Sequence, residues 1–135
     1  MDIEQGQWIA ELIGQALAGI ENQPGLTIEV EDRAALWLQV LLESDEYDPK
    51  KLSGFVLNFP YRGFAEAPLQ ILHQHNITPP PDTKMLTWDK TQFATLWLRP
   101  DTPLIGLALF IGDIFSQIIG ADNDADFNIQ IEYGY

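Results

Sequence analysis

The acidic run Asp122-Asn123-Asp124-Ala125-Asp126 is the strongest candidate for metal chemistry in this sequence. Asp at positions 1, 3 and 5 is how a calcium-binding EF-hand loop begins. That loop also requires Gly at position 6 and Glu at position 12, where this chain has Phe127 and Tyr133. We therefore interpret the run as an acidic turn before a strand, and we expect neither a metal ligand set nor any cofactor.

The side chains that most often catalyse reactions are poorly arranged here. His73 and His75 are two residues apart, so on a helix they would point to different faces and could not chelate one ion together. Ser53 and Ser116 lack both a Gly-x-Ser-x-Gly setting and a nearby His–acid pair in sequence. The ten glycines are scattered and Cys is absent, which excludes a phosphate-binding loop and thiolate chemistry. The sequence therefore indicates a protein that is not an enzyme.

Composition narrows the class of partner. The chain has 135 residues, 46% of them hydrophobic and 20% charged, which suits one globular domain spanning residues 1–135. Its 20 acidic and 7 basic residues give a formal net charge of -13, and this field repels nucleic acid and anionic membranes. No apolar run is long enough for a membrane span. Asp2 and Glu4 occupy the region where a signal peptide is basic, so we expect a cytoplasmic protein.

Hydrophobic periodicity predicts an α+β fold in the order α-β-β-β-α-β-β-α-β. We expect a mainly antiparallel sheet of about six strands, with three helices packed on one face. The predicted helices are residues 2–20, 66–76 and 103–120, and the predicted strands are 26–30, 34–42, 55–59, 84–88, 92–99 and 127–133.

Local signals set several of these boundaries. Asn22, Pro24 and Gly25 are expected to end the first helix. Thr102 is the predicted N-cap of the last helix, with Pro103 at its first position, and Gly120 is its expected stop. The strands at 84–88 and 92–99 are predicted to form a hairpin around Asp89 and Lys90.

The segment 34–42 is ambiguous, because its apolar residues occupy both parities. Periodicity alone does not separate a central strand from a buried helix in such a run. The alternating segments on either side would give a strand its partners, so we predict a strand.

The parity of side chains along the strands separates two faces of the sheet. On the strands at 34–42 and 92–99, one parity is purely aliphatic and is expected to face the helices. The other carries tryptophan beside polar residues, which is typical of a semi-exposed contact surface. Four residues are predicted to form this partner-binding surface: Trp37, Leu41, Val56 and Trp97. The alternative is that a loop, or the helix at 66–76, covers these positions within the monomer.

The stretch Phe93-Ala-Thr-Leu-Trp-Leu-Arg-Pro-Asp-Thr-Pro-Leu104 predicts a strand that leads into a long apolar helix. Together with the element order, small size, acidic composition and missing Cys, it resembles the last unit of class I type III secretion chaperones and the related YbjN-like (TY-Chap) domains. The resemblance covers roughly residues 2–120 and leaves the strand at 127–133 outside it. It implies a non-enzymatic, dimeric protein that holds an extended segment of a partner. That group has no invariant motif, so no functional residue is carried over.

These observations lead to one expected function and one alternative. We expect a non-enzymatic, chaperone-like domain that binds an extended, basic segment of a protein client and forms a homodimer. Strong negative charge keeps a protein with an apolar surface soluble and favours a basic client. The alternative is an acidic immunity or inhibitor protein that neutralises a folded basic partner, since it needs the same surface features.

Overall fold

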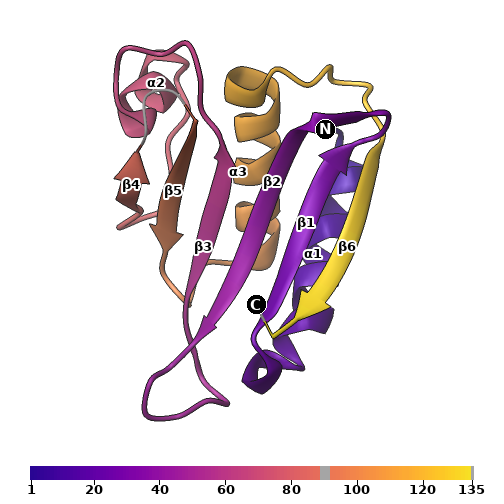
Figure 1. Cartoon of the computed structure of the whole chain (residues 1–135), viewed down its shortest axis with the longest axis vertical. Helices are drawn as coiled ribbons and strands as arrows, with labels where there is room; N and C mark the ends of the chain where they lie inside the picture. Colours follow the sequence, from indigo (N-terminus) through magenta and orange to yellow (C-terminus); the bar gives the residue numbers. More distant parts are fainter. Residues whose placement is uncertain (89–91, 135) are drawn as a thin grey trace.

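A computed structural model describes residues 1–88 and 92–134 of the chain. Its strands form one antiparallel sheet in the order β4-β5-β3-β2-β1-β6 (Figure 1). The strands are β1 (Pro24–Val30), β2 (Arg33–Ser44), β3 (Leu52–Pro60), β4 (Lys84–Trp88), β5 (Phe93–Leu98) and β6 (Phe127–Tyr133). The predicted tip of the β4–β5 hairpin, Asp89 and Lys90, lies outside the described residues.

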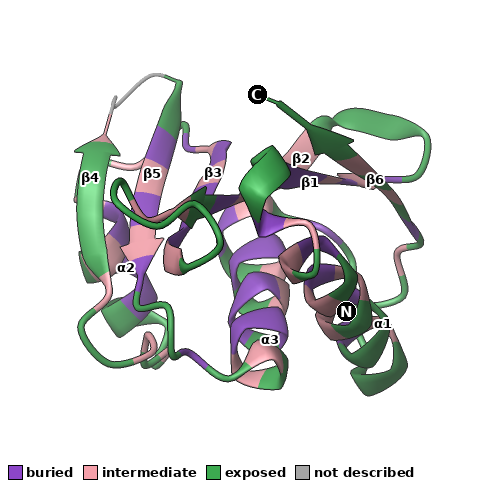
Figure 2. Ribbon diagram, turned by 90° about the horizontal axis from the view of Figure 1, so that it is seen from below, coloured by how far each residue is buried: buried purple, intermediate pink, exposed green. Residues whose placement is uncertain are grey.

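The helices are α1 (Ile3–Leu17), α2 (Pro68–Gln74) and α3 (Leu104–Ile114). A short 3-10 turn, η1 (Ile20–Asn22), follows α1, and one π-helical turn, η2 (Phe115–Ile119), extends α3. All three helices lie on the same side of the sheet, with α1 behind β1 and β6 and α3 behind β2 and β3 (Figures 1 and 2). The predicted α+β class and the order of elements are therefore confirmed.

The ambiguous segment 34–42 is a strand, as predicted, and belongs to β2 at the centre of the sheet. Leu38, Val40 and Leu42 are fully buried against the helices. Trp37 and Leu41 on the opposite face are half-buried. The strand is apolar on both parities because Trp37 and Leu41 form an apolar surface on the face that points away from the helices.

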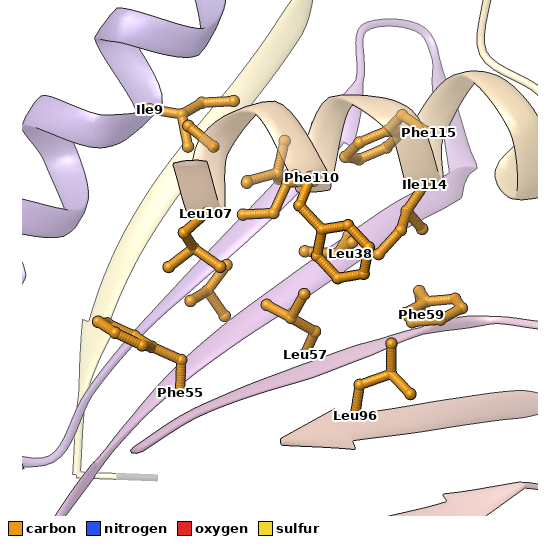
Figure 3. Close-up of a cluster of buried hydrophobic side chains, with 14 of the residues drawn as sticks. Ile9, Leu38, Phe55, Leu57, Phe59, Leu96, Leu107, Phe110, Ile114 and Phe115 are labelled. Atoms are coloured by element: carbon orange, nitrogen blue, oxygen red, sulfur yellow. The ribbon is translucent and has the colours of Figure 1, made fainter. Parts of the chain in front are cut away.

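The core fills the space between the sheet and its helices. The phenylalanines of β3, Phe55 and Phe59, point toward α3, whose own buried side chains include Leu107, Phe110 and Ile114 (Figure 3). Phe115 and Phe127 meet edge to face with ring centroids 5.0 Å apart, which joins the end of α3 to β6. Helix α3 is apolar over most of its circumference because it packs against both the sheet and α1.

Two of the predicted boundary signals are wrong, and β3 begins three residues earlier than predicted, at Leu52. Thr102 does not cap α3, because its hydroxyl donates to the Arg99 carbonyl at 2.7 Å, and the N-cap position is Pro103. Pro24 and Gly25 do not end the first helix but begin β1, after Gln23 adopts a left-handed conformation with φ 53°. The predicted stop at Gly120 is confirmed, since Gly120 is the left-handed C-cap of η2 with φ 90°.

Candidate interaction surface

The candidate surface is the sheet face opposite α1 and α3, called the front face here. Within residues 1–88 and 92–134, all helices lie on the other side of the sheet (Figure 2). In particular, α2 contributes Ile71 and Leu72 to the same core as α3, so α2 does not cover the front face. The side chains on this face therefore meet one another, the solvent or a partner.

A first apolar row crosses three neighbouring strands of the front face. Leu41 of β2 is opposite Val56 of β3, and Val56 is opposite Trp97 of β5. Leu41 and Trp97 are half-buried, whereas Val56 is only 4% exposed. Directly opposed side chains on one sheet face lie within contact distance, so the three form a continuous strip with Val56 beneath its neighbours.

The nitrogen-bearing edge of the Trp97 indole occupies the space beside Gly54, which has no side chain. A Cβ atom added at Gly54 would come within 2.8 Å of Trp97 Cε2 and 3.0 Å of its Cδ1. On the other side of the strip, Lys84 Nζ is 5.3 Å from the centroid of the Trp97 ring. Trp97 is therefore held between a glycine and an ammonium group, in cation–π geometry.

A polar row follows the first apolar row along the strands. Asn58 Nδ2 donates to Gln39 Oε1 at 3.5 Å, and Thr95 Oγ1 donates to Asn58 Oδ1 at 3.3 Å. These three residues oppose one another across β2, β3 and β5. Each keeps hydrogen-bonding capacity beyond these bonds, so the row can also bond a partner.

A second apolar region lies beyond the polar row and contains Trp37, Pro60 and Phe93. Pro60 and Phe93 are opposed, Trp37 is half-buried, and Phe93 is 40% exposed. These three residues help to line a pocket of about 350 Å³ at the end of the sheet, with Arg62 and Ile118 among its other walls. The pocket is large enough for an apolar side chain.

Carboxylates flank the apolar regions on the same face. Glu29 is opposite Trp37, Glu43 is opposite Gly54 beside the first apolar row, and Glu132 is opposite Gly25 at the β6 side. Glu43 and Glu132 are exposed. The front face thus combines apolar contact area with three carboxylates, while Lys84 lies over Trp97 and Arg62 lies in the wall of the pocket.

The structure brings together three of the four residues predicted for this surface, namely Leu41, Val56 and Trp97. Trp37 lies on the same face but across the polar row. Sequence reasoning missed Gly54 and Lys84, which fix the position of Trp97. A glycine inside a strand often marks the close approach of another group, so the role of Gly54 could have been predicted from the sequence. The role of Lys84 could not, because it depends on the pairing of β4 with β5, which sets Lys84 opposite Trp97.

A titratable group whose pKa is strongly raised lies away from this face. Tyr61 is fully buried, stacks on Phe64 at 4.8 Å, and donates its hydroxyl to the Glu66 carbonyl at 2.6 Å. Burial, and then the nearby Glu66 charge, raise the pKa of Tyr61 to about 12. Its neutral form is stabilised, which suits a structural hydrogen bond rather than proton transfer near neutral pH.

The sequence candidates for metal chemistry lie apart from the front face. Residues 122–126 form a turn in which Ala125 N–H donates to the Asp122 carbonyl at 3.1 Å, and β6 begins at Phe127. His73 and His75 are exposed at the end of α2. In the described part of the chain, no three His, Cys, Asp or Glu side chains are grouped to hold a metal ion. Nor does any helix described there have the length and apolarity needed to cross a membrane.

Comparisons with family models, curated proteins and solved structures find no match for this chain.

Proposed function

We propose that this protein is a non-enzymatic, chaperone-like domain that holds an extended segment of a partner protein against its front face and works as a dimer. The observation that carries the proposal is the composition of the front face. Two apolar regions, one polar row and a carboxylate border lie on a sheet face that the helices leave uncovered. Apolar surface of this kind usually marks an interface.

The spacing of the rows favours an extended client. Leu41 and Trp37 are four residues apart on β2, with Gln39 of the polar row between them. Side chains on one side of an extended peptide recur every second residue, at about 6.6–6.8 Å. A segment that runs parallel to β2 therefore places every second side chain on successive rows. The surface fits a segment with apolar side chains at positions 1 and 5 and a hydrogen-bonding side chain at position 3.

The charge of the surface favours a basic client. The chain carries a formal net charge of -13, and Glu29, Glu43 and Glu132 border the apolar regions. Lys or Arg at the outward positions of the segment would be attracted by this negative charge over a distance, because those side chains point away from the sheet face. Such complementarity speeds association and selects the partner more than it adds affinity.

Titration calorimetry with synthetic peptides tests the proposal. One peptide carries Leu, Thr and Trp at positions 1, 3 and 5 with Lys between them, and a second has the same residues in scrambled order. We expect the ordered peptide to bind and its affinity to fall as NaCl is raised. Equal binding of both peptides, or of neither, would contradict the proposal, as would binding confined to a folded basic protein, which the immunity alternative requires.

Variants locate the binding surface. Trp37→Ala and Trp97→Ala, checked for folding by circular dichroism, should each weaken peptide binding about tenfold or more. Leu109→Ala is the matched control, because Leu109 is 49% exposed on α3, behind the sheet.

Gln39→Lys covers the case in which the tryptophan variants unfold, since it obstructs the polar row and repels a basic segment without removing apolar contacts. Gln74→Lys, an exposed position on α2, makes the same charge change away from the front face. Unchanged binding in folded Trp37→Ala, Trp97→Ala and Gln39→Lys would exclude this surface.

A further inference from the structure

The two edges of the sheet are protected to different degrees. Edge strand β4 has five residues, a register shift between Met85 and Thr87, and Lys84 at its start. Short length, bulges and lysine are features that keep edge strands from pairing with other chains. Edge strand β6 has seven residues and an unbroken register with β1, from Pro24↔Tyr133 to Val30↔Phe127. Its sequence, FNIQIEY, contains neither Lys nor Pro.

The backbone groups on the free side of β6 follow from the hydrogen bonds on its other side. Glu31 N–H donates to the Asp126 carbonyl at 2.8 Å, and Gly134 N–H donates to the Gln23 carbonyl at 3.2 Å. In an antiparallel ladder, residues bonded to the neighbour alternate with residues whose N–H and C=O point away from it. The even-numbered positions of β6 therefore bond β1. The free edge presents the backbone groups of the odd-numbered residues: Phe127, Ile129, Ile131 and Tyr133.

Apolar side chains lie next to this free edge on the helix side of the sheet. Ile129 and Ile131 are only half-buried against the core. Gln5 Nε2 donates to the Ala125 carbonyl at 2.7 Å, so the flank of α1 that carries Gln5 faces the chain that enters β6. Trp8 lies three residues further along that flank and is 42% exposed. A strand added beside β6 would cover these side chains.

We propose that the free edge of β6 pairs antiparallel with the same edge of a second copy, so that two sheets join into one across a two-fold axis at Gln130. This inference takes the dimeric state from the proposed function and assigns it to a surface other than the front face. A two-fold at Gln130 sets Ile129 opposite Ile131 of the second copy and Phe127 opposite its Tyr133. Every outward N–H and C=O of both strands then has a partner, in about eight hydrogen bonds.

Side-chain charge and strand length favour the register with its axis at Gln130 over the registers with axes at Ile129 and Ile131. With the axis at Gln130, Asn128 is opposite Glu132 of the second copy, and an amide donates well to a carboxylate. Moving the axis to Ile129 sets Glu132 opposite Asp126 of the second copy, and like charges directly opposite are destabilising. Moving it to Ile131 leaves Phe127 beyond the end of the paired strand. The strand is thus complementary to itself in one register.

Analytical ultracentrifugation of the full chain over a range of concentrations tests the pairing. We expect a monomer–dimer equilibrium that shifts toward dimer as NaCl rises, because two chains of formal charge -13 repel each other. Gln130→Glu sets two carboxylates opposite each other at the axis and close to Glu132 of both copies, and should weaken the dimer about tenfold. Gln74→Glu, an exposed position on α2 beside the opposite edge, adds the same charge and should leave the dimer unchanged.

The rates of amide hydrogen exchange test the same interface at the level of single residues. The N–H groups of Ile129 and Ile131 should exchange more slowly at concentrations that favour the dimer, while those of β4 keep their rates. A monomer at all concentrations and salt levels, or equal dimer constants for Gln130→Glu and Gln74→Glu, would overturn the proposal. So would protection of Ile129 that appears only when a client peptide is added.

The two proposals fail separately. Loss of the β6 pairing leaves peptide binding to the front face of the monomer measurable by calorimetry. Loss of peptide binding in Trp37→Ala leaves the ultracentrifugation result intact, because Trp37 lies in β2, two strands away from β6.

Discussion

Trp97 determines the shape of the front face at the first apolar row. Its indole occupies the space that a side chain at position 54 would need, and it lies opposite Val56, which it helps to bury. The first apolar row is therefore a packed unit with an exposed outer surface. Its shape depends on Gly54 as much as on the residues that a partner would touch.

Gly54→Ala tests this dependence. The added methyl group overlaps the indole ring, so Trp97 must swing away from the sheet or β3 must shift. We expect the free energy of unfolding in urea to fall by about 1–3 kcal/mol. The fluorescence of Trp97, obtained as the difference from a Trp97→Phe background, should shift toward that of a solvated indole.

Gly106→Ala is the matched control for this change. Gly106 lies in α3 with no heavy atom near its would-be Cβ. Alanine there should stabilise the protein by about 0.5–1 kcal/mol. A Gly54→Ala protein as stable as the wild type would show that Trp97 does not need this space.

Tyr61 gives a pH-dependent prediction. Its pKa is raised to about 12 in the folded protein, mainly by burial, against 10.0 for an ordinary tyrosine. A raised pKa means that the unfolded chain loses this proton first, so the contribution to stability is complete below about pH 10 and is lost as the pH rises to about 12. The melting temperature of the wild type should therefore fall faster than that of Tyr61→Phe over this range.

At neutral pH, Tyr61→Phe should be less stable than the wild type by about 1 kcal/mol, because the Glu66 carbonyl loses its donor. Parallel melting curves for the two proteins between pH 10 and 12 would contradict a buried, neutral Tyr61.

At the scale of elements, hydrophobic pattern was enough for most of the fold. β6 has the predicted bounds because Phe127, Ile129 and Ile131 alternate with polar residues. The start of α3 was mispredicted because Thr102 bonds backward to Arg99, a local choice that no spacing rule distinguishes from a cap. The division of the front face into rows was also beyond prediction, because it depends on cross-strand register, which no single strand encodes.

Gln5 links two elements that are far apart in sequence. Its Oε1 accepts from Asp2 N–H at 2.9 Å in the capping box of α1, and its Nε2 donates to the Ala125 carbonyl at 2.7 Å. A capping box accepts Glu as readily as Gln at this position. Gln5→Glu therefore preserves the cap but sets a carboxylate against the Ala125 carbonyl.

We expect Gln5→Glu to lower the free energy of unfolding by about 1–3 kcal/mol, with faster amide exchange at the start of β6. Asp2→Ala is the comparison, because it breaks the cap and leaves the Ala125 bond available, and should cost about 1 kcal/mol without a specific effect on β6. Equal exchange rates in β6 for the two variants would show that Gln5 acts on α1 alone.

At the scale of the molecule, negative charge is weakly compensated. The chain has 20 acidic and 7 basic residues, and the ion pairs found in the described part join Arg99 to Asp82 at 2.9 Å and to Asp101 at 2.7 Å. Exposed pairs of this kind contribute little to stability. Self-repulsion of the folded chain is therefore the dominant electrostatic effect at neutral pH.

Added salt should stabilise the isolated protein. Screening shortens the range of repulsion to about 10 Å at 0.1 M and about 3 Å at 1 M, so the melting temperature should rise from low to high NaCl at pH 7. Peptide binding to the front face should weaken over the same range. A melting temperature that falls with NaCl would show that attractive pairs outweigh the repulsion.

The position of β1 between β2 and β6 has a consequence for synthesis on the ribosome. β1 can pair with β2 once both strands have emerged, but the partner for its other side, β6, is translated last. Until then the strands already made can form at most a five-stranded sheet whose edge is β1, and Phe115 has no Phe127 ring to pack against. Contacts between such distant segments form slowly, and open edges in partly folded chains promote aggregation. Translation past β6 is therefore the step that ends this exposure.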